Sequence, residues 1–155
     1  MKTVTALIWI ALAGAIIAAD QQEIKALPEG PGKEAVVKAC LECHGAANFR
    51  KARKEPGEWS DSVDDMVDRG AKIPTGQTEA VVAYLVKNFG AGAKVQMNSA
   101  PLEEIKMVLG FTVPEAQAVV DYRELHGAYK DWREVAKVRG VDVEKVEAKK
   151  DSMAF

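Results

Sequence analysis

The chain has only two cysteines and two histidines among its 155 residues, and it has no excess of basic charge. Lysine and arginine number 21 against 23 aspartate and glutamate residues, which gives a net charge of -2. Such a balance argues against a strongly basic nucleic-acid surface and against a polybasic patch for membranes. The two cysteines are also too few for a zinc site built from four thiolates.

The N-terminus carries an uncharged run from Thr3 to Ala19, which follows a single basic residue, Lys2, and precedes Asp20. This is the layout of a secretory signal peptide. We therefore expect residues 1–19 to be a signal peptide and the protein to act in the periplasm. An uncleaved membrane anchor is the alternative, because the run is just long enough to span a bilayer. Membrane contact is expected only in that case.

Both cysteines lie in the segment Cys40-Leu41-Glu42-Cys43-His44. The pattern C-x-x-C-H is typical of the attachment site of a c-type heme. Two thiols one helical turn apart can reach the two vinyl groups on one porphyrin edge, and the next histidine can bind the iron. A zinc ribbon would need a second pair of ligands, and a redox dithiol would not require His44. The motif therefore predicts one covalently attached heme c.

A methionine is the usual sixth ligand of such an iron. Met66 lies 22 residues after His44, and it recurs at helical spacing with Trp59 and Val63. One face of a short helix would present these side chains together. Core filling is the other explanation for a methionine in this position. We predict that Met66 is the second axial ligand.

Three stretches, LPEGPGKEAVVKACLECHG, EW followed by VDDMVDRGA, and EAVVAYLVKNFG, resemble the small class I cytochromes c that serve periplasmic quinoprotein and sulfite dehydrogenases. The resemblance covers residues 27–90 and implies an all-α heme domain, which we place at residues 20–94. It also implies that Trp59 packs near a heme edge. By the same resemblance, Cys40 and Cys43 attach the heme, and His44 and Met66 bind its iron. Arg50 and Arg53 have two explanations at this point. They pair with the heme propionates, or they are charges exposed to solvent.

The rest of the chain, residues 95–155, contains an approximate repeat, in which IKMVLGFTVPEAQAV is echoed by WREVAKVRGVDVEKVEAK. In each copy an apolar helix runs into a glycine, Gly110 or Gly140, and a short turn leads to another helix. This segment resembles the duplicated helix-hairpin-helix domain of the competence DNA-uptake proteins. The same architecture also occurs in proteins that dock to other proteins.

Two features of this half argue against DNA binding. The hairpins read Gly110-Phe111-Thr112 and Gly140-Val141-Asp142, whereas DNA-binding members have a second glycine that lets the backbone approach a phosphate. The half also has 9 basic residues against 11 acidic ones. We therefore expect docking and not nucleic-acid binding. His126, which stands before Gly127, is expected to cap a helix and not to bind iron.

The sequence thus predicts an all-α protein, with a class I cytochrome c domain followed by a duplicated helix-hairpin-helix domain. Its expected function is single-electron transport through heme iron, with the second domain docking it to a redox partner or an envelope electron-transfer complex. One alternative is a DNA-binding, competence-like module with an accessory heme. Another is a heme enzyme or ligand sensor with an open sixth site. Catalysis is not expected, because no general base, nucleophile or second cofactor is evident.

Overall fold

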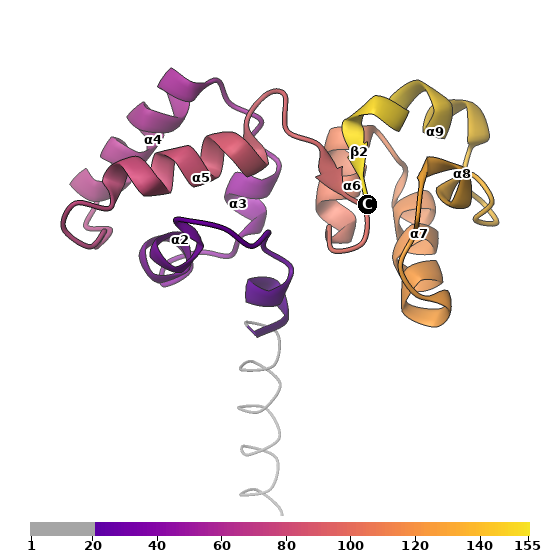
Figure 1. Ribbon diagram of the computed structural model, residues 1–155, viewed down its shortest axis with the longest axis horizontal. Helices are drawn as coiled ribbons and strands as arrows, with labels where there is room; N and C mark the ends of the chain where they lie inside the picture. The colour runs from indigo at the N-terminus through magenta and orange to yellow at the C-terminus, as the bar shows by residue number, and fades with distance from the viewer. Residues whose placement is uncertain (1–20) are drawn as a thin grey trace, which may run out of the picture.

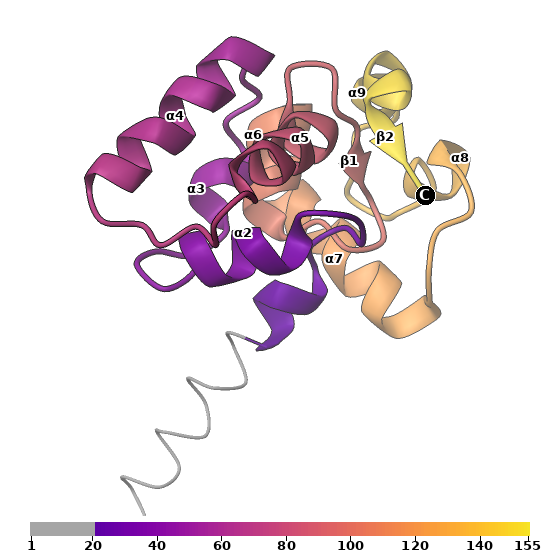
Figure 2. The ribbon, with the colours of Figure 1, turned by 60° about the vertical axis from the view of Figure 1, so that its left-hand side comes forward.

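The structure is a computed structural model, and it describes residues 21–155. The expected signal peptide at residues 1–19 lies outside the described residues. Within them the chain is mostly helical and forms two halves joined by a short connection (Figures 1 and 2). The predicted helical class is confirmed. No helix in residues 21–155 is long and apolar enough to cross a membrane.

The first half consists of helices α2 (Lys33–Cys40), α3 (Ala47–Arg50), α4 (Pro56–Asp68) and α5 (Thr78–Phe89). Helix α5 packs against α2, α3 and α4, so it lies at the centre of this half (Figure 1). A capping box opens α4, because Glu58 accepts a hydrogen bond from the backbone of Glu55 and Pro56 holds the first turn. The buried core includes Val36, Phe49, Trp59, Val63, Val81, Tyr84, Leu85 and Phe89.

The second half contains four helices, α6 (Leu102–Leu109), α7 (Val113–His126), α8 (Trp132–Val135) and α9 (Val143–Lys149). A 3-10 turn, η1 (Lys150–Ser152), follows α9. Strand β1 (Val95–Gln96) pairs in parallel with β2 (Met153–Ala154), so the two ends of this half lie side by side. Its core is separate from that of the first half and includes Met97, Ile105, Leu109, Phe111, Val119, Tyr129, Val135 and Val146. The boundary between residues 94 and 95 stays a prediction.

The predicted repeat corresponds to two helical hairpins in this half. Hairpin 1 is formed by α6 and α7, and hairpin 2 by α8 and α9. Gly110 and Gly140 turn the chain at φ angles of 74° and 91°, in the left-handed region that favours glycine. Thr112 caps α7 by accepting a hydrogen bond from the N–H of Glu115, and Asp142 caps α9.

Glu115 joins the two hairpins. Its carboxylate accepts hydrogen bonds from the N–H of Thr112 at 2.7 Å and of Asp142 at 3.3 Å, and it pairs with Lys145 at 2.6 Å. Burial alone would raise the pKa of Glu115. The hydrogen bonds from Lys145, Thr112 and Asp142 outweigh that effect and lower the pKa to about 2. The charged form is therefore strongly favoured in the folded protein.

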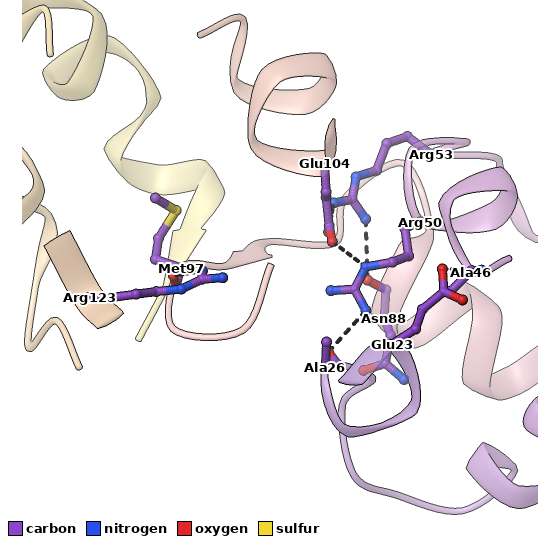
Figure 3. A network of polar contacts seen from close by, with 9 residues as sticks. All are labelled: Glu23, Ala26, Ala46, Arg50, Arg53, Asn88, Met97, Glu104 and Arg123. Carbon is purple, nitrogen blue, oxygen red and sulfur yellow. Dashed lines mark hydrogen bonds and ion pairs between the residues drawn. The ribbon is translucent and has the colours of Figure 1, made fainter. Parts of the chain in front are cut away.

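A buried ion-pair cluster joins the two halves (Figure 3). Glu104, on α6, accepts hydrogen bonds from Arg50 Nε and Arg53 Nη2, both at 2.7 Å. Arg50 also donates to the carbonyl of Ala26, and Arg53 to that of Asn88. Arg50 is 2 % exposed and Glu104 3 %. Both sequence-based explanations for the two arginines are wrong, since they bind neither propionates nor solvent but a carboxylate of the other half.

Replacing Glu104 by glutamine should lower the free energy of unfolding by about 3–5 kcal/mol, because two desolvated guanidinium groups lose their anion. Urea denaturation followed by circular dichroism measures this. The neighbouring Glu103→Gln is the matched control, because Glu103 forms only an exposed pair with Lys106 at 2.9 Å. Its expected cost is about 0–1 kcal/mol. Equal losses in the two variants would contradict a structural role for the buried cluster.

Glu115→Gln should lower the free energy of unfolding by about 1–3 kcal/mol at pH 7, because buried donors lose a charged acceptor. The contribution of Glu115 is present above its ordinary pKa of 4.5 and is lost as the pH falls toward about 2. The variant should therefore lose less stability than the wild type between these two pH values. Glu147→Gln, at an exposed position of α9, should keep the wild-type slope. A slope unchanged by Glu115→Gln would show that this carboxylate does not hold the hairpins together.

Candidate functional site

The first half contains a cavity of about 170 Å³ between α2, α4 and α5. Four of the five predicted site residues line it, namely Cys40, His44, Trp59 and Met66. Sequence reasoning therefore brought together side chains from two separate helices and the turn after α2. The fifth residue, Cys43, is exposed and lines a different hollow on the surface.

The cavity is apolar over most of its wall and polar at a few atoms. Trp59 is 4 % exposed, and its Nε1 is buried without a hydrogen-bond partner among the described residues. Lys54 also lines the cavity, donates a hydrogen bond to Ser62 and lies 5.6 Å from the centre of the Trp59 ring. Burial raises the pKa of the Cys40 thiol, so it is protonated at neutral pH.

This geometry does not fit the expected heme c. Both thiols would have to face one porphyrin edge, but only Cys40 lines the cavity and Cys43 lies outside it. Across residues 21–155, no group of three or more histidine, cysteine or acidic side chains is arranged to hold a metal ion.

His126 lies in the other half, at the exposed end of α7, where the sequence placed it. It is the last helical residue before Gly127, and its ring packs on Tyr122 with the ring centres 4.4 Å apart. Tyr122 in turn stacks on Tyr129. The position at the helix C-terminus suits a side chain that carries positive charge when protonated.

Hairpin 2 presents basic side chains that sequence reasoning missed. Lys137 and Arg139 are exposed just before Gly140, and neither forms an ion pair within the described part of the chain. Residues 130–150 carry seven basic side chains against five acidic ones, whereas residues 95–129 carry two against five. Counting charge over the whole half concealed this division. The alternating Lys-Val-Arg-Gly sequence before the turn is the signal that could have revealed it.

The two hairpin turns are open to solvent. A Cβ atom added at Gly110 or Gly140 would meet nothing within 4 Å, so a ligand can approach the backbone there. Asp142, however, uses its carboxylate to accept hydrogen bonds from the N–H of Glu144 and Lys145. The backbone N–H groups at the start of α9 are therefore already bonded to Asp142. An anion near hairpin 2 would be attracted by Lys137 and Arg139 instead.

Comparison with known proteins places the second half in a family. The profile of the helix-hairpin-helix motif matches residues 90–153. ComE operon protein 1 of Bacillus subtilis is 34 % identical over 64 residues, which are 41 % of this chain and 31 % of that protein. An uncharacterized protein of Haemophilus influenzae is 32 % identical over 84 residues, which are 54 % of this chain and 71 % of the relative. No solved structure matches the chain.

These matches correct the function expected from the C-x-x-C-H motif. Single-electron transport, a heme c cofactor with its iron, and a redox complex as the partner were wrong, because the matching profile and relatives point to a helix-hairpin-helix protein of the competence type. Only three positions of that motif are specified, so it also occurs without heme. The prediction that this half does not bind nucleic acid was wrong as well. It rested on the missing second glycine of each hairpin and on charge averaged over both hairpins.

The resemblance to the helix-hairpin-helix domain of competence proteins is confirmed, and that to the class I cytochromes c is not supported by the matches. The repeat, the two glycine turns and the matched profile coincide in the same residues. The chain also covers 71 % of a relative with which it is 32 % identical. The second half of this chain belongs to the helix-hairpin-helix family.

Proposed function

We propose that this protein is a DNA-binding module of the competence type, and that hairpin 2 contacts the phosphate backbone. The observation that carries the proposal is the exposed pair of basic side chains, Lys137 and Arg139, directly before the open turn at Gly140. The family match and the similarity to ComE operon protein 1 support it. The chain spans 31 % of that relative's length, so the proposal concerns the matched domain.

The charge distribution favours hairpin 2 over hairpin 1 as the contact. Hairpin 2 has a net positive charge, and exposed Lys149 and Lys150 lie at the end of α9 and the start of η1. Lysine and arginine that neutralise phosphates release counterions, which supplies most of the affinity in sequence-independent binding. Contacts to phosphate carry no base information. The proposed binding is therefore independent of DNA sequence and sensitive to salt.

The first half has a supporting role in this proposal. Glu104 lies on the first helix of hairpin 1 and is held by Arg50 and Arg53 of the first half. Glu115 then connects hairpin 1 to hairpin 2. The proposed site of action is the periplasm, on the basis of the expected signal peptide. The proposed activity is binding, and it includes no catalytic step.

Lys137→Gln together with Arg139→Gln should weaken binding to duplex DNA about tenfold, because two phosphate contacts are lost. The slope of log affinity against log salt should become shallower by about 2, since each neutralised phosphate contributes about 0.9. Fluorescence anisotropy of a labelled duplex at several salt concentrations measures both quantities. Two duplexes of unrelated sequence should give the same affinity.

The matched control is Lys51→Gln together with Lys72→Gln, which removes two exposed lysines from the first half. This control should keep the wild-type affinity and salt slope. Equal weakening in both double variants would mean that overall charge, and not hairpin 2, governs binding. Absence of any salt-dependent binding by the wild type would refute the proposed function.

A further inference from the structure

The cavity of the first half has no part in DNA binding by hairpin 2, yet it is built as a binding site. Its wall is formed by apolar side chains of α4 and α5, among them Val63, Val81 and Leu85, and by Ile73 from the segment between these helices. An apolar cavity of this size can take up a small aromatic molecule. The volume of about 170 Å³ corresponds to a single six-membered ring with a short substituent.

Two of the side chains that line the cavity, Trp59 and Lys54, carry hydrogen-bond donors without an acceptor group, beside the mixed donor–acceptor groups of Asn48, His44 and Ser62. The Nε1 of Trp59 is buried without a partner among the described residues, although a buried tryptophan N–H usually has one. The ammonium group of Lys54 has no carboxylate partner in residues 21–155, and its hydrogen bond goes to the neutral hydroxyl of Ser62. Two donors without an acidic partner favour an anionic acceptor on the ligand.

We propose that this cavity binds a small aromatic carboxylate. The ring lies among the apolar side chains of α4 and α5, and the carboxylate accepts hydrogen bonds from Trp59 Nε1 and Lys54. Lys54 is half-buried at the cavity wall, so its charge strengthens the interaction with an anion more than an exposed lysine would. This site is independent of the proposed DNA contact, which lies on the other half.

Benzoate and benzene are the probes that test the site. In a ¹⁵N–¹H spectrum of the full chain, benzoate should shift the indole N–H signal of Trp59, which is assigned by its loss in Trp59→Phe. The shift should saturate. Lys54→Met keeps an unbranched side chain without the charge, so it should weaken benzoate binding about tenfold and leave benzene binding unchanged. Lys51→Met, at an exposed position nearby, should change neither.

A variant that fills the cavity provides the second test. Ala52 lines the cavity and is half-buried, so Ala52→Leu should weaken the binding of both probes. The proposal is overturned if benzoate leaves the Trp59 signal unmoved, or if Lys54→Met binds benzoate as well as the wild type does. Binding of benzene without benzoate would overturn the carboxylate class. None of these results depends on the DNA affinity, so the two proposals fail separately.

Discussion

The buried carboxylate of Glu104 is the interaction on which the arrangement of the two halves depends. It brings a negative charge from α6 into contact with two guanidinium groups, those of Arg50 at the end of α3 and of Arg53 just after that helix, at 2.7 Å each. Such a desolvated cluster is costly when incomplete, so it forms only when both halves are folded and docked. The backbone carbonyls of Ala26 and Asn88 accept hydrogen bonds from further guanidinium N–H groups, whereas Arg53 Nε has no partner among the described residues.

A second buried carboxylate organises the hairpins in the same way. Glu115 accepts hydrogen bonds from the cap of its own helix and from the turn of the other hairpin. Each hairpin turn contains a glycine in the left-handed region. The relative position of the two turns therefore depends on a polar contact as well as on apolar packing. That position decides which backbone and side-chain groups can face a phosphate together.

Local patterns in the sequence predicted the helices, the repeat and the glycine turns, because each depends on residues that are close in the chain. The spacing of Trp59 and Met66 also predicted that both side chains lie on one face of a helix, and both line the same cavity. The partner of Arg50 could not be predicted in this way, since Glu104 lies 54 positions away and nothing in the sequence links the two. The C-x-x-C-H pattern misled for a related reason. Spacing gives the distance between two thiols along a helix, but it does not say whether both face the same cavity.

The parallel pairing of Val95–Gln96 with Met153–Ala154 has a consequence for folding during synthesis. The first half has a core complete by Phe89, so it can form while the rest of the chain is still in the ribosome. The second half cannot close its sheet until residues 153 and 154 have emerged, because one of its two strands is then still missing. Its pairing is non-local, which slows folding. Until that contact forms, α6 can already pack against the folded first half, but the rest of its own half is not yet folded.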